Sequence, residues 1–286
     1  MSSKVKLTLP SGLTASCLDH PEAHDVAAEV GILDVGKHPE NLLGGGRAHR
    51  QGMLPIPEHS LRFWQPCLLT STCMSQANLI AHQEACRACH VCVEDGIIAE
   101  ANPTFEGHWR APFMLVGQAP GPTERESRRP FSGRAGKELD RWMLRAGFVS
   151  ADEFRRLTYI AALMRCFPGR NAAGTGDLRP PPAAVVNCAR WLDAELRILK
   201  PNVLIPVGLM AINRFLGPGS LEGRVGKRFG ERPVVVPLPH PSGTSRWLND
   251  PANRQRLAEA LELIADLRLR HAPPPKKILS TAARNR

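Results

Sequence analysis

Short apolar runs alternate with amphipathic segments along most of the chain after residue 78. Four apolar runs predict buried strands, at residues 113–116, 158–164, 203–207 and 234–238. Four segments with helical periodicity lie between or after them, at residues 137–146, 183–199, 209–216 and 253–269. Strands that alternate with crossover helices form parallel sheets. The pattern therefore predicts an α/β fold, a three-layer α/β/α sandwich around a central four-stranded parallel sheet.

The first part of the chain has a different character. It carries scattered Gly, Pro and His and shows little sustained periodicity. We expect residues 1–78 to form an N-terminal extension that is partly disordered, residues 79–270 to form the α/β domain, and residues 271–286 to form a basic tail.

Positive charge is concentrated in the predicted domain and tail. The formal net charge is +10, and residues 1–100 hold 7 of the 37 Lys and Arg against 11 of the 27 Asp and Glu. A basic surface favours DNA by neutralising phosphates, although a surplus of this kind also serves solubility. No apolar run is long enough to span a bilayer and no secretory signal is evident, so we expect a cytoplasmic protein without a membrane partner.

Two motifs directly follow predicted strands. Residues 117–121 read Gly-Gln-Ala-Pro-Gly after the first strand, and residues 240–242 read His-Pro-Ser after the fourth. Ligands of parallel α/β sheets bind beyond the carboxyl ends of the strands, so both motifs fall where a site is expected. Taken alone, the first motif also fits an ordinary strand-to-loop turn.

Two further segments lie between these motifs, and together they carry a resemblance. Residues 129–136 read Arg-Pro-Phe-Ser-Gly-Arg-Ala-Gly, and residues 159–166 run from Tyr to Cys. In this order, with Cys86 and Cys89 upstream and Cys188 downstream, the segments resemble the uracil-DNA glycosylase superfamily and, within it, the iron-sulfur (family 4-like) class. The resemblance covers roughly residues 79–269 and implies removal of deaminated bases from DNA.

The first motif departs from this pattern. The resemblance implies that Gly117, Gln118 and Ala119 bind the base and sugar, but iron-sulfur members usually carry Glu in place of Gln118. A neutral Gln cannot act as a general base. The main uracil-DNA glycosylase class carries an acid that positions water at the place of Ala119. Cleavage through an oxocarbenium-like sugar needs charge stabilisation more than a strong base. Glu124, with Gln118, is the catalytic candidate; Glu126 is an alternative, and both acids also fit a solvated loop.

Two positions are implied to contact the extruded base. Phe131 matches the residue whose ring stacks on the base, and its Pro, Ser and Gly neighbours favour a loop over a core strand. Ala162 stands where the family carries an Asn that recognises the uracil edge. Without that amide, hydrogen-bond selection of uracil is weakened, and a different or broader set of lesions becomes plausible.

The His-Pro-Ser motif is implied to polarise the base and contact DNA. His240 corresponds to the residue that donates to the base carbonyl and stabilises the departing anion. The loop after Ser242 corresponds to one that enters the minor groove, with Arg246 on phosphate and Trp247 or Leu248 as a wedge. Trp247 fits internal packing equally well.

Cysteines form a second group of candidate functional residues, and four thiolates suit either a 4Fe-4S cluster or Zn. The resemblance implies a 4Fe-4S cluster held by Cys86, Cys89, Cys166 and Cys188. Cys92 is an alternative ligand because it forms an equally spaced pair with Cys89, and residues 171–177 form an apparent insertion between the later ligands.

Three hypotheses account for these features. The first is a monomeric DNA glycosylase that acts on uracil or a related deaminated base in single-stranded or duplex DNA and leaves an abasic site. The second retains the fold but only binds damaged or abasic DNA, as the missing carboxylates and Asn suggest. The third is a Zn-stabilised α/β protein unrelated to DNA.

Overall fold

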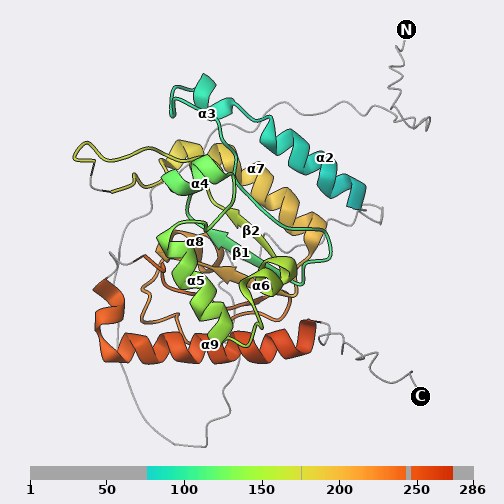
Figure 1. The fold of residues 1–286 in the computed structure, drawn as a ribbon, viewed down its shortest axis with the longest axis vertical. Helices are drawn as coiled ribbons and strands as arrows, with labels where there is room; N and C mark the ends of the chain where they lie inside the picture. Colours follow the sequence, from blue (N-terminus) through green and yellow to red (C-terminus); the bar gives the residue numbers. More distant parts are fainter. Residues whose placement is uncertain (1–75, 175, 243–245, 273–286) are drawn as a thin grey trace, which may run out of the picture. The chain divides into compact units, whose positions relative to one another are not determined.

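A computed structural model describes residues 76–174, 176–242 and 246–272. Its sheet has four parallel strands, β1 (Phe113–Gly117), β2 (Thr158–Ala162), β3 (Val203–Pro206) and β4 (Val234–Val235) (Figure 1). The main helices are α2 (Gln76–Arg87), α5 (Arg134–Arg145), α7 (Pro182–Leu199), α8 (Leu209–Leu216) and α9 (Pro251–His271). Shorter helical segments are α3 (Val91–Glu94), α4 (Pro122–Ser127), α6 (Ala151–Leu157) and η2 (Arg246–Asn249).

The strand order is β2-β1-β3-β4, so β1 is central. In the register, Phe113 pairs with Thr158 of β2 and with Val203 of β3. The carboxyl ends of the strands therefore meet at one edge, where Gly117 lies opposite Ala162. This register brings the first motif beside the segment that follows β2.

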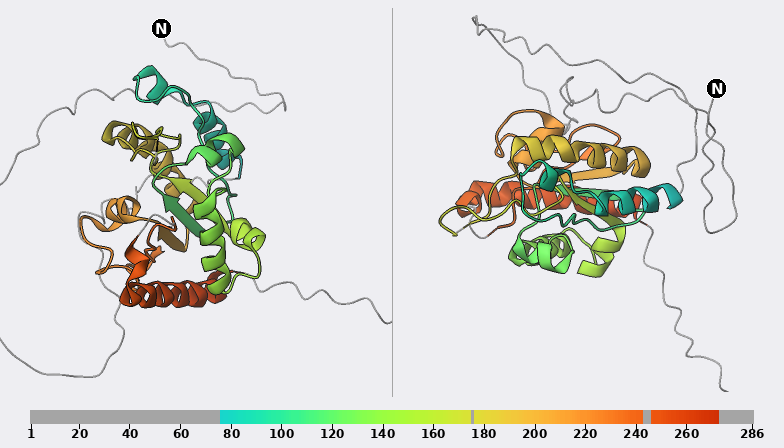
Figure 2. Two further views of the ribbon diagram at one scale, coloured as in Figure 1. Left: turned by 60° about the vertical axis from the view of Figure 1, so that its left-hand side comes forward. Right: turned by 90° about the horizontal axis from the view of Figure 1, so that it is seen from above.

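Alternate residues of β1 serve two separate cores. Phe113 and Leu115 pack with apolar side chains of α5, α6 and α9, whereas Met114 and Val116 pack with those of α2, α7 and α8. Because successive strand residues point to opposite faces, one strand contributes to both layers. The helices therefore cover both faces of the sheet, as Figure 2 shows, and the predicted three-layer sandwich is confirmed.

The predicted elements agree in place and differ at their ends. Helix α8 has the predicted bounds, and α9 starts earlier because Asp250 caps it and Pro251 opens its first turn. The fourth strand is shorter than residues 234–238, although Leu238 still forms a parallel bridge with Val207. Helix α2 starts at Gln76, inside the segment assigned to the extension. The rest of that extension and most of the basic tail lie outside the described residues.

Over the described part of the chain, no helix has the length and apolar character that a membrane span requires.

Candidate active site

The first motif closes the carboxyl end of β1. The carbonyl oxygens of Gly117 and Gln118 accept hydrogen bonds from the N–H groups of Leu163 and Met164, both at 3.0 Å. Gly117 is buried, while Gln118 and Ala119 are partly exposed. Ala162 is buried beside Gly117 and offers no side-chain donor or acceptor.

Phe131 faces this strand end. A Cβ on Gly117 would lie 3.2 Å from Cζ of the Phe131 ring, so the ring sits directly against the motif. Phe131 adopts a left-handed backbone with φ of 51°, which is uncommon for a non-glycine residue and is often found at functional sites. A Cβ at position 136 would lie 1.7 Å from the Phe131 carbonyl oxygen, so only Gly136 permits this loop.

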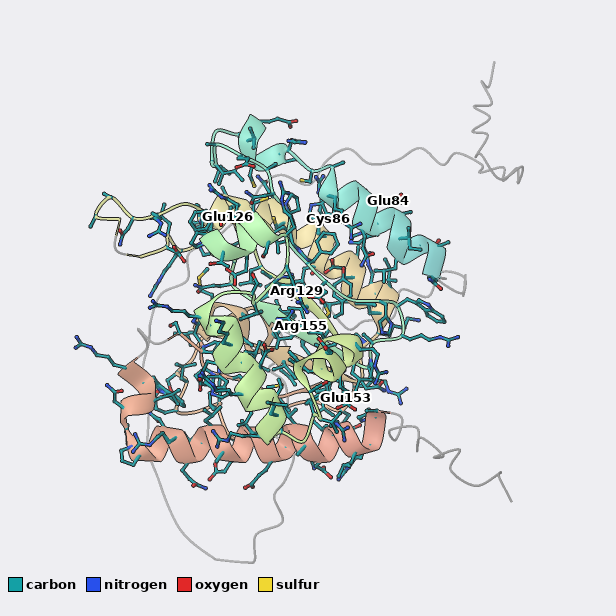
Figure 3. All side chains as sticks on the ribbon, in the orientation of Figure 1. Glu84, Cys86, Glu126, Arg129, Glu153 and Arg155 are labelled. Atoms are coloured by element: carbon teal, nitrogen blue, oxygen red, sulfur yellow. The ribbon has the colours of Figure 1, made fainter. Side chains whose placement is uncertain are left out.

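Arg155 holds the Phe131 loop in place. Its guanidinium donates to the carbonyl oxygens of Pro130 at 3.0 Å and Phe131 at 2.9 Å. It also forms a 2.8 Å ion pair with Glu106, and its side chain is only 7% exposed. Figure 3 shows Arg155 beneath Arg129, which reaches the same Glu106 carboxylate. Arg155 was not predicted, because no local motif marks a buried arginine in α6.

Glu124 joins two of the predicted segments. One carboxylate oxygen accepts the N–H of Gly121 at 3.1 Å, and the other accepts the N–H of Gly133 at 2.8 Å. The residue is 9% exposed, so it is not the solvated acid that the charged sequence also allowed. Glu126, two residues further along α4 and on the other side of the helix, is exposed.

A second carboxylate comes from the apparent insertion. A Cβ on Gly121 would lie 3.4 Å from Oδ2 of Asp177, on the same side as Glu124. Asp177 is exposed and forms an antiparallel bridge with Arg170. Sequence reasoning missed this residue because the return of the insertion toward the first motif depends on long-range contacts.

His240 completes this group of residues. A Cβ on Gly208 would lie 3.5 Å from both Cβ and Cδ2 of His240, so the imidazole packs against the turn after β3. Burial lowers the pKa of His240 below its usual 6.5, and the Glu124 carboxylate opposes this effect by raising it. The imidazole is therefore neutral at pH 7 and retains one N–H donor.

The predicted DNA-contacting residues occupy different environments. Arg246 is exposed at the start of η2, and Ser242 is partly buried. The Trp247 indole N–H donates to Glu222 at 2.5 Å, and its ring is partly buried against the core. These contacts favour internal packing of Trp247 over the wedge that the resemblance implied.

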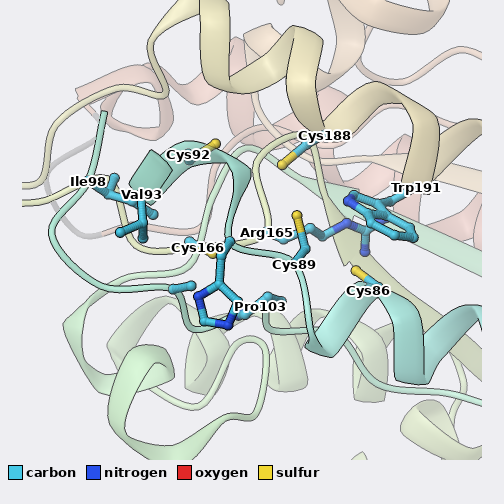
Figure 4. A pocket seen from close by; sticks show the side chains of 12 residues that line it. Cys86, Cys89, Cys92, Val93, Ile98, Pro103, Arg165, Cys166, Cys188 and Trp191 are labelled. Atoms are coloured by element: carbon cyan, nitrogen blue, oxygen red, sulfur yellow. The ribbon is translucent and has the colours of Figure 1, made fainter. Parts of the chain in front are cut away.

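A separate pocket brings five cysteines together. They come from α2, α3, the residues between these two helices, the segment after β2, and α7, and Figure 4 shows their side chains around it: Cys86, Cys89, Cys92, Cys166 and Cys188. Within the described ranges, no three Cys, His, Asp or Glu side chains are close enough to share a single metal ion.

Three of the five sulfurs accept a hydrogen bond. Cys89 accepts from Arg190 at 3.7 Å, Cys92 from Asn187 at 3.8 Å and Cys166 from the N–H of Asn102 at 3.4 Å. The backbone of Arg165 acts on the Cys188 thiol and partly offsets the rise in its pKa. Within the described part of the chain, no group donates to Cys86, which packs instead with the core residues of α2 and α7.

Burial governs the titration of these thiols. It raises the pKa of Cys86 and of Cys166 to about 12, and it also raises the pKa of Cys92 and Cys188. Such thiols stay protonated at neutral pH unless a metal centre displaces the protons.

Comparisons with known proteins agree with this architecture. A family model described as the uracil DNA glycosylase superfamily matches residues 105–267, more than half of the chain. A Type-4 uracil-DNA glycosylase from Pyrobaculum aerophilum is 32% identical over 126 residues, which cover 44% of this chain and 57% of that protein.

Two further relatives give the same result. A Type-4 uracil-DNA glycosylase from Archaeoglobus fulgidus is 28% identical over 146 residues, covering 48% of this chain and 68% of that protein. A Type-5 uracil-DNA glycosylase from Thermus thermophilus is 30% identical over 144 residues, covering 47% and 58%. The matches thus leave parts of both chains unpaired, but the family model spans the sheet and both motifs. The chain belongs to the uracil-DNA glycosylase superfamily.

Proposed function

We propose that this protein is a monofunctional DNA glycosylase that hydrolyses the N-glycosidic bond of uracil or a related deaminated base and leaves an abasic site. The observation that carries the proposal is the position of Glu124. Its carboxylate bridges the first motif, at Gly121, to the Phe131 segment, at Gly133, and acts electrostatically on His240. Motifs far apart in sequence therefore share one location at the carboxyl end of the sheet.

Each residue has a role in this proposal. The extruded base stacks on Phe131, which replaces the stacking that it loses in DNA. The neutral His240 imidazole donates its N–H to the base carbonyl, where negative charge develops as the bond to the sugar breaks. Water then attacks the cationic sugar carbon and becomes the sugar hydroxyl, and the proton that it loses neutralises the departed base anion.

We assign the positioning of the attacking water to the carboxylates beside the first motif. Both oxygens of Glu124 already accept backbone N–H groups, so Glu124 chiefly fixes the loops and contributes negative charge. Asp177 is exposed beside Gly121, and we assign it the role of orienting the water together with Gln118. Neither residue needs to be a strong base, because the transition state is cationic at the sugar.

Base selection differs from a uracil-specific pattern. Ala162 lies beside Gly117 and cannot form the paired hydrogen bonds that an amide gives to a uracil edge. Selection then depends on stacking and on the His240 contact, which many deaminated bases share. We therefore propose that the substrate range is broader than uracil.

The cysteine pocket is proposed to hold a 4Fe-4S cluster with a structural role. Cysteines from several separate segments line this one pocket, and Cys thiolates are the usual ligands of such a cluster. We assign the ligands as Cys89, Cys92, Cys166 and Cys188, in preference to a set with Cys86. The sulfurs of Cys89, Cys92 and Cys166 accept N–H hydrogen bonds, as metal ligands usually take part in further hydrogen bonds, whereas the Cys86 sulfur accepts none within the described residues. When bound, the cluster would tie α3 and the residues just before it to α7 and to the segment after β2.

The direct experiment measures base release by cluster-loaded protein. Single-stranded and duplex oligonucleotides carry uracil, hypoxanthine or xanthine, and free base and abasic product are quantified. We expect release of at least one of these bases. The absence of release from all of them, on either form of DNA, would contradict the proposal.

A second candidate is a damage-binding or abasic-site-binding protein of the same fold. Gln118, Ala119 and Ala162 favour it, because each lacks the functional group of the corresponding family residue. It predicts tight binding to lesion-containing DNA without base release over hours, so the same experiment separates the two candidates.

A further inference from the structure

The wall of the cysteine pocket contains a buried arginine that has no role in the proposed base release. Arg165 directly precedes Cys166, lines the pocket and is 1% exposed. Its Nη2 donates to Oε2 of Glu195. Its Nε and Nη1 are also buried, and neither has a hydrogen-bond partner within the described part of the chain. A buried donor without an acceptor is costly, so these atoms indicate a missing acceptor.

A second donor faces the same pocket. The indole Nε1 of Trp191 is buried and, within the ranges described, finds no acceptor. The ring makes an edge contact with His82, at a centroid distance of 5.4 Å, and a cation–π contact with Arg190, whose guanidinium carbon lies 4.6 Å from the ring centroid. Figure 4 shows Trp191 and Arg165 on one side of the pocket, near Cys86 and Cys89.

Arg165 is fixed in this position by a buried network. Glu195 is fully buried, and it accepts the Tyr159 hydroxyl at 2.8 Å as well as the Arg165 guanidinium. The Glu195 carboxylate has a lowered pKa despite its burial, because Arg165 stabilises its charged form. The pair therefore remains ionised, and the Arg165 side chain cannot turn its unpaired N–H groups toward water.

We propose that Arg165 and Trp191 donate hydrogen bonds to sulfur atoms of the cluster, and that Arg165 offsets part of its negative charge. This inference rests on the proposed cluster. Four thiolates and the sulfides of a 4Fe-4S cluster supply anionic acceptors, and charge-assisted hydrogen bonds are the stronger ones. Because the reduced cluster is more negative than the oxidised one, these donors stabilise the reduced state and raise the reduction potential.

The experiment measures the reduction potential of the cluster in anaerobically purified full-length protein. Trp191→Phe keeps an aromatic ring and removes only the N–H donor. Trp109→Phe is the matched control, since the Trp109 indole donates to Gln76 and lies outside the cysteine pocket. We expect a lower potential for Trp191→Phe than for wild type, and no change for Trp109→Phe. Equal potentials in all three proteins, with full iron content, would overturn the inference.

Arg165→Lys gives a second measurement that does not depend on Trp191. It keeps one positive charge for Glu195 but loses the planar donors Nε and Nη1. We expect a lower potential and at least about threefold faster cluster loss in air than in wild type. An unchanged potential and an unchanged rate would again contradict the inference. Wild-type protein that binds no iron would refute the cluster itself, a result that differs from a loaded cluster whose potential does not respond.

Discussion

The amide of Gln118 takes up no proton from water at neutral pH, and Ala119 beside it has no polar group. A site with these residues must stabilise charge by other means. The described geometry offers a buried carboxylate, Glu124, and a partly buried neutral imidazole, His240. At the scale of single residues, the proposed base release therefore depends on positioned charge rather than on a strong base.

The variant Glu124→Gln tests whether the Glu124 carboxylate bridges the two loops. Gln has one carbonyl oxygen, so it cannot accept from both Gly121 and Gly133, and one buried donor is left unpaired. We expect the free energy of unfolding to fall by about 1–3 kcal/mol and base release to fall by about tenfold. Glu126→Gln, on the exposed side of the same helix, is the control and should match wild type in denaturant titration and in single-turnover excision. Equal behaviour of the two variants would contradict the bridging role.

The pKa of His240 leads to a pH prediction. Burial holds this pKa in the folded protein below the unfolded value of 6.5, so the unfolded state binds a proton first as the pH falls. The stability linked to neutral His240 is therefore complete above pH 6.5 and is lost as the pH drops toward the folded pKa. We expect wild type to lose more unfolding free energy than His240→Asn between about pH 7.5 and pH 5.5. An NMR titration that gives His240 a pKa at or above 6.5 would disprove the assignment.

At the scale of elements, helix α6 and the Phe131 loop behave as one unit. Arg155 of α6 donates to two carbonyl oxygens of that loop, and Gly136 of α5 leaves room for the left-handed turn. The loop is thus positioned by elements on either side of it. A site that stacks a flipped base needs this rigidity, because a loose ring would not hold the base near the imidazole.

Arg155→Gln tests this unit. The change removes the ion pair with Glu106 and at least one hydrogen bond to the loop, so we expect about fivefold lower excision and a less ordered Phe131. Arg156→Gln changes the exposed neighbour and should leave single-turnover rates unaltered. Tryptic cleavage within the Phe131 loop offers a second readout, expected to be faster only in Arg155→Gln. Full activity and normal protection in that variant would rule out the positioning role.

Prediction from sequence succeeded where the signal was local. Apolar runs located all four strands, and periodicity located the helices that became α5, α7, α8 and α9. The short helices α4 and α6 were missed because a helix of six or seven residues carries too little periodicity. The motif residues were found in sequence, whereas Arg155 and Asp177 were not, since their importance comes from contacts with distant segments.

At the scale of the whole molecule, the cysteine pocket joins parts of the chain that are distant in sequence. Helix α2, helix α3 and the residues between them contribute three of its cysteines, while the segment after β2 and helix α7 contribute Cys166 and Cys188. Sequence spacing alone could not separate Cys86 from Cys92, because both lie three residues from Cys89. In the structure the two differ, because the Cys92 sulfur accepts a hydrogen bond from Asn187 and the Cys86 sulfur accepts none within the described residues.

Single serine substitutions separate the two ligand sets. We expect wild type and Cys86→Ser to contain about four iron atoms per protein after anaerobic purification, and Cys92→Ser to contain clearly fewer. Removing a ligand should also lower the melting temperature, since the proposed cluster would join α3 to the domain. Iron retention by Cys92→Ser combined with loss from Cys86→Ser would reverse the assignment.

The most direct measurement of the central claim is single-turnover excision paired with DNA binding for wild type and His240→Ala. His271→Ala serves as the control, because His271 ends α9 and lies outside the group formed by Glu124, Phe131 and His240. On the base that wild type releases, the account predicts at least about tenfold slower excision by His240→Ala with nearly unchanged DNA affinity, and wild-type behaviour for His271→Ala. Excision at the wild-type rate by His240→Ala would contradict the account.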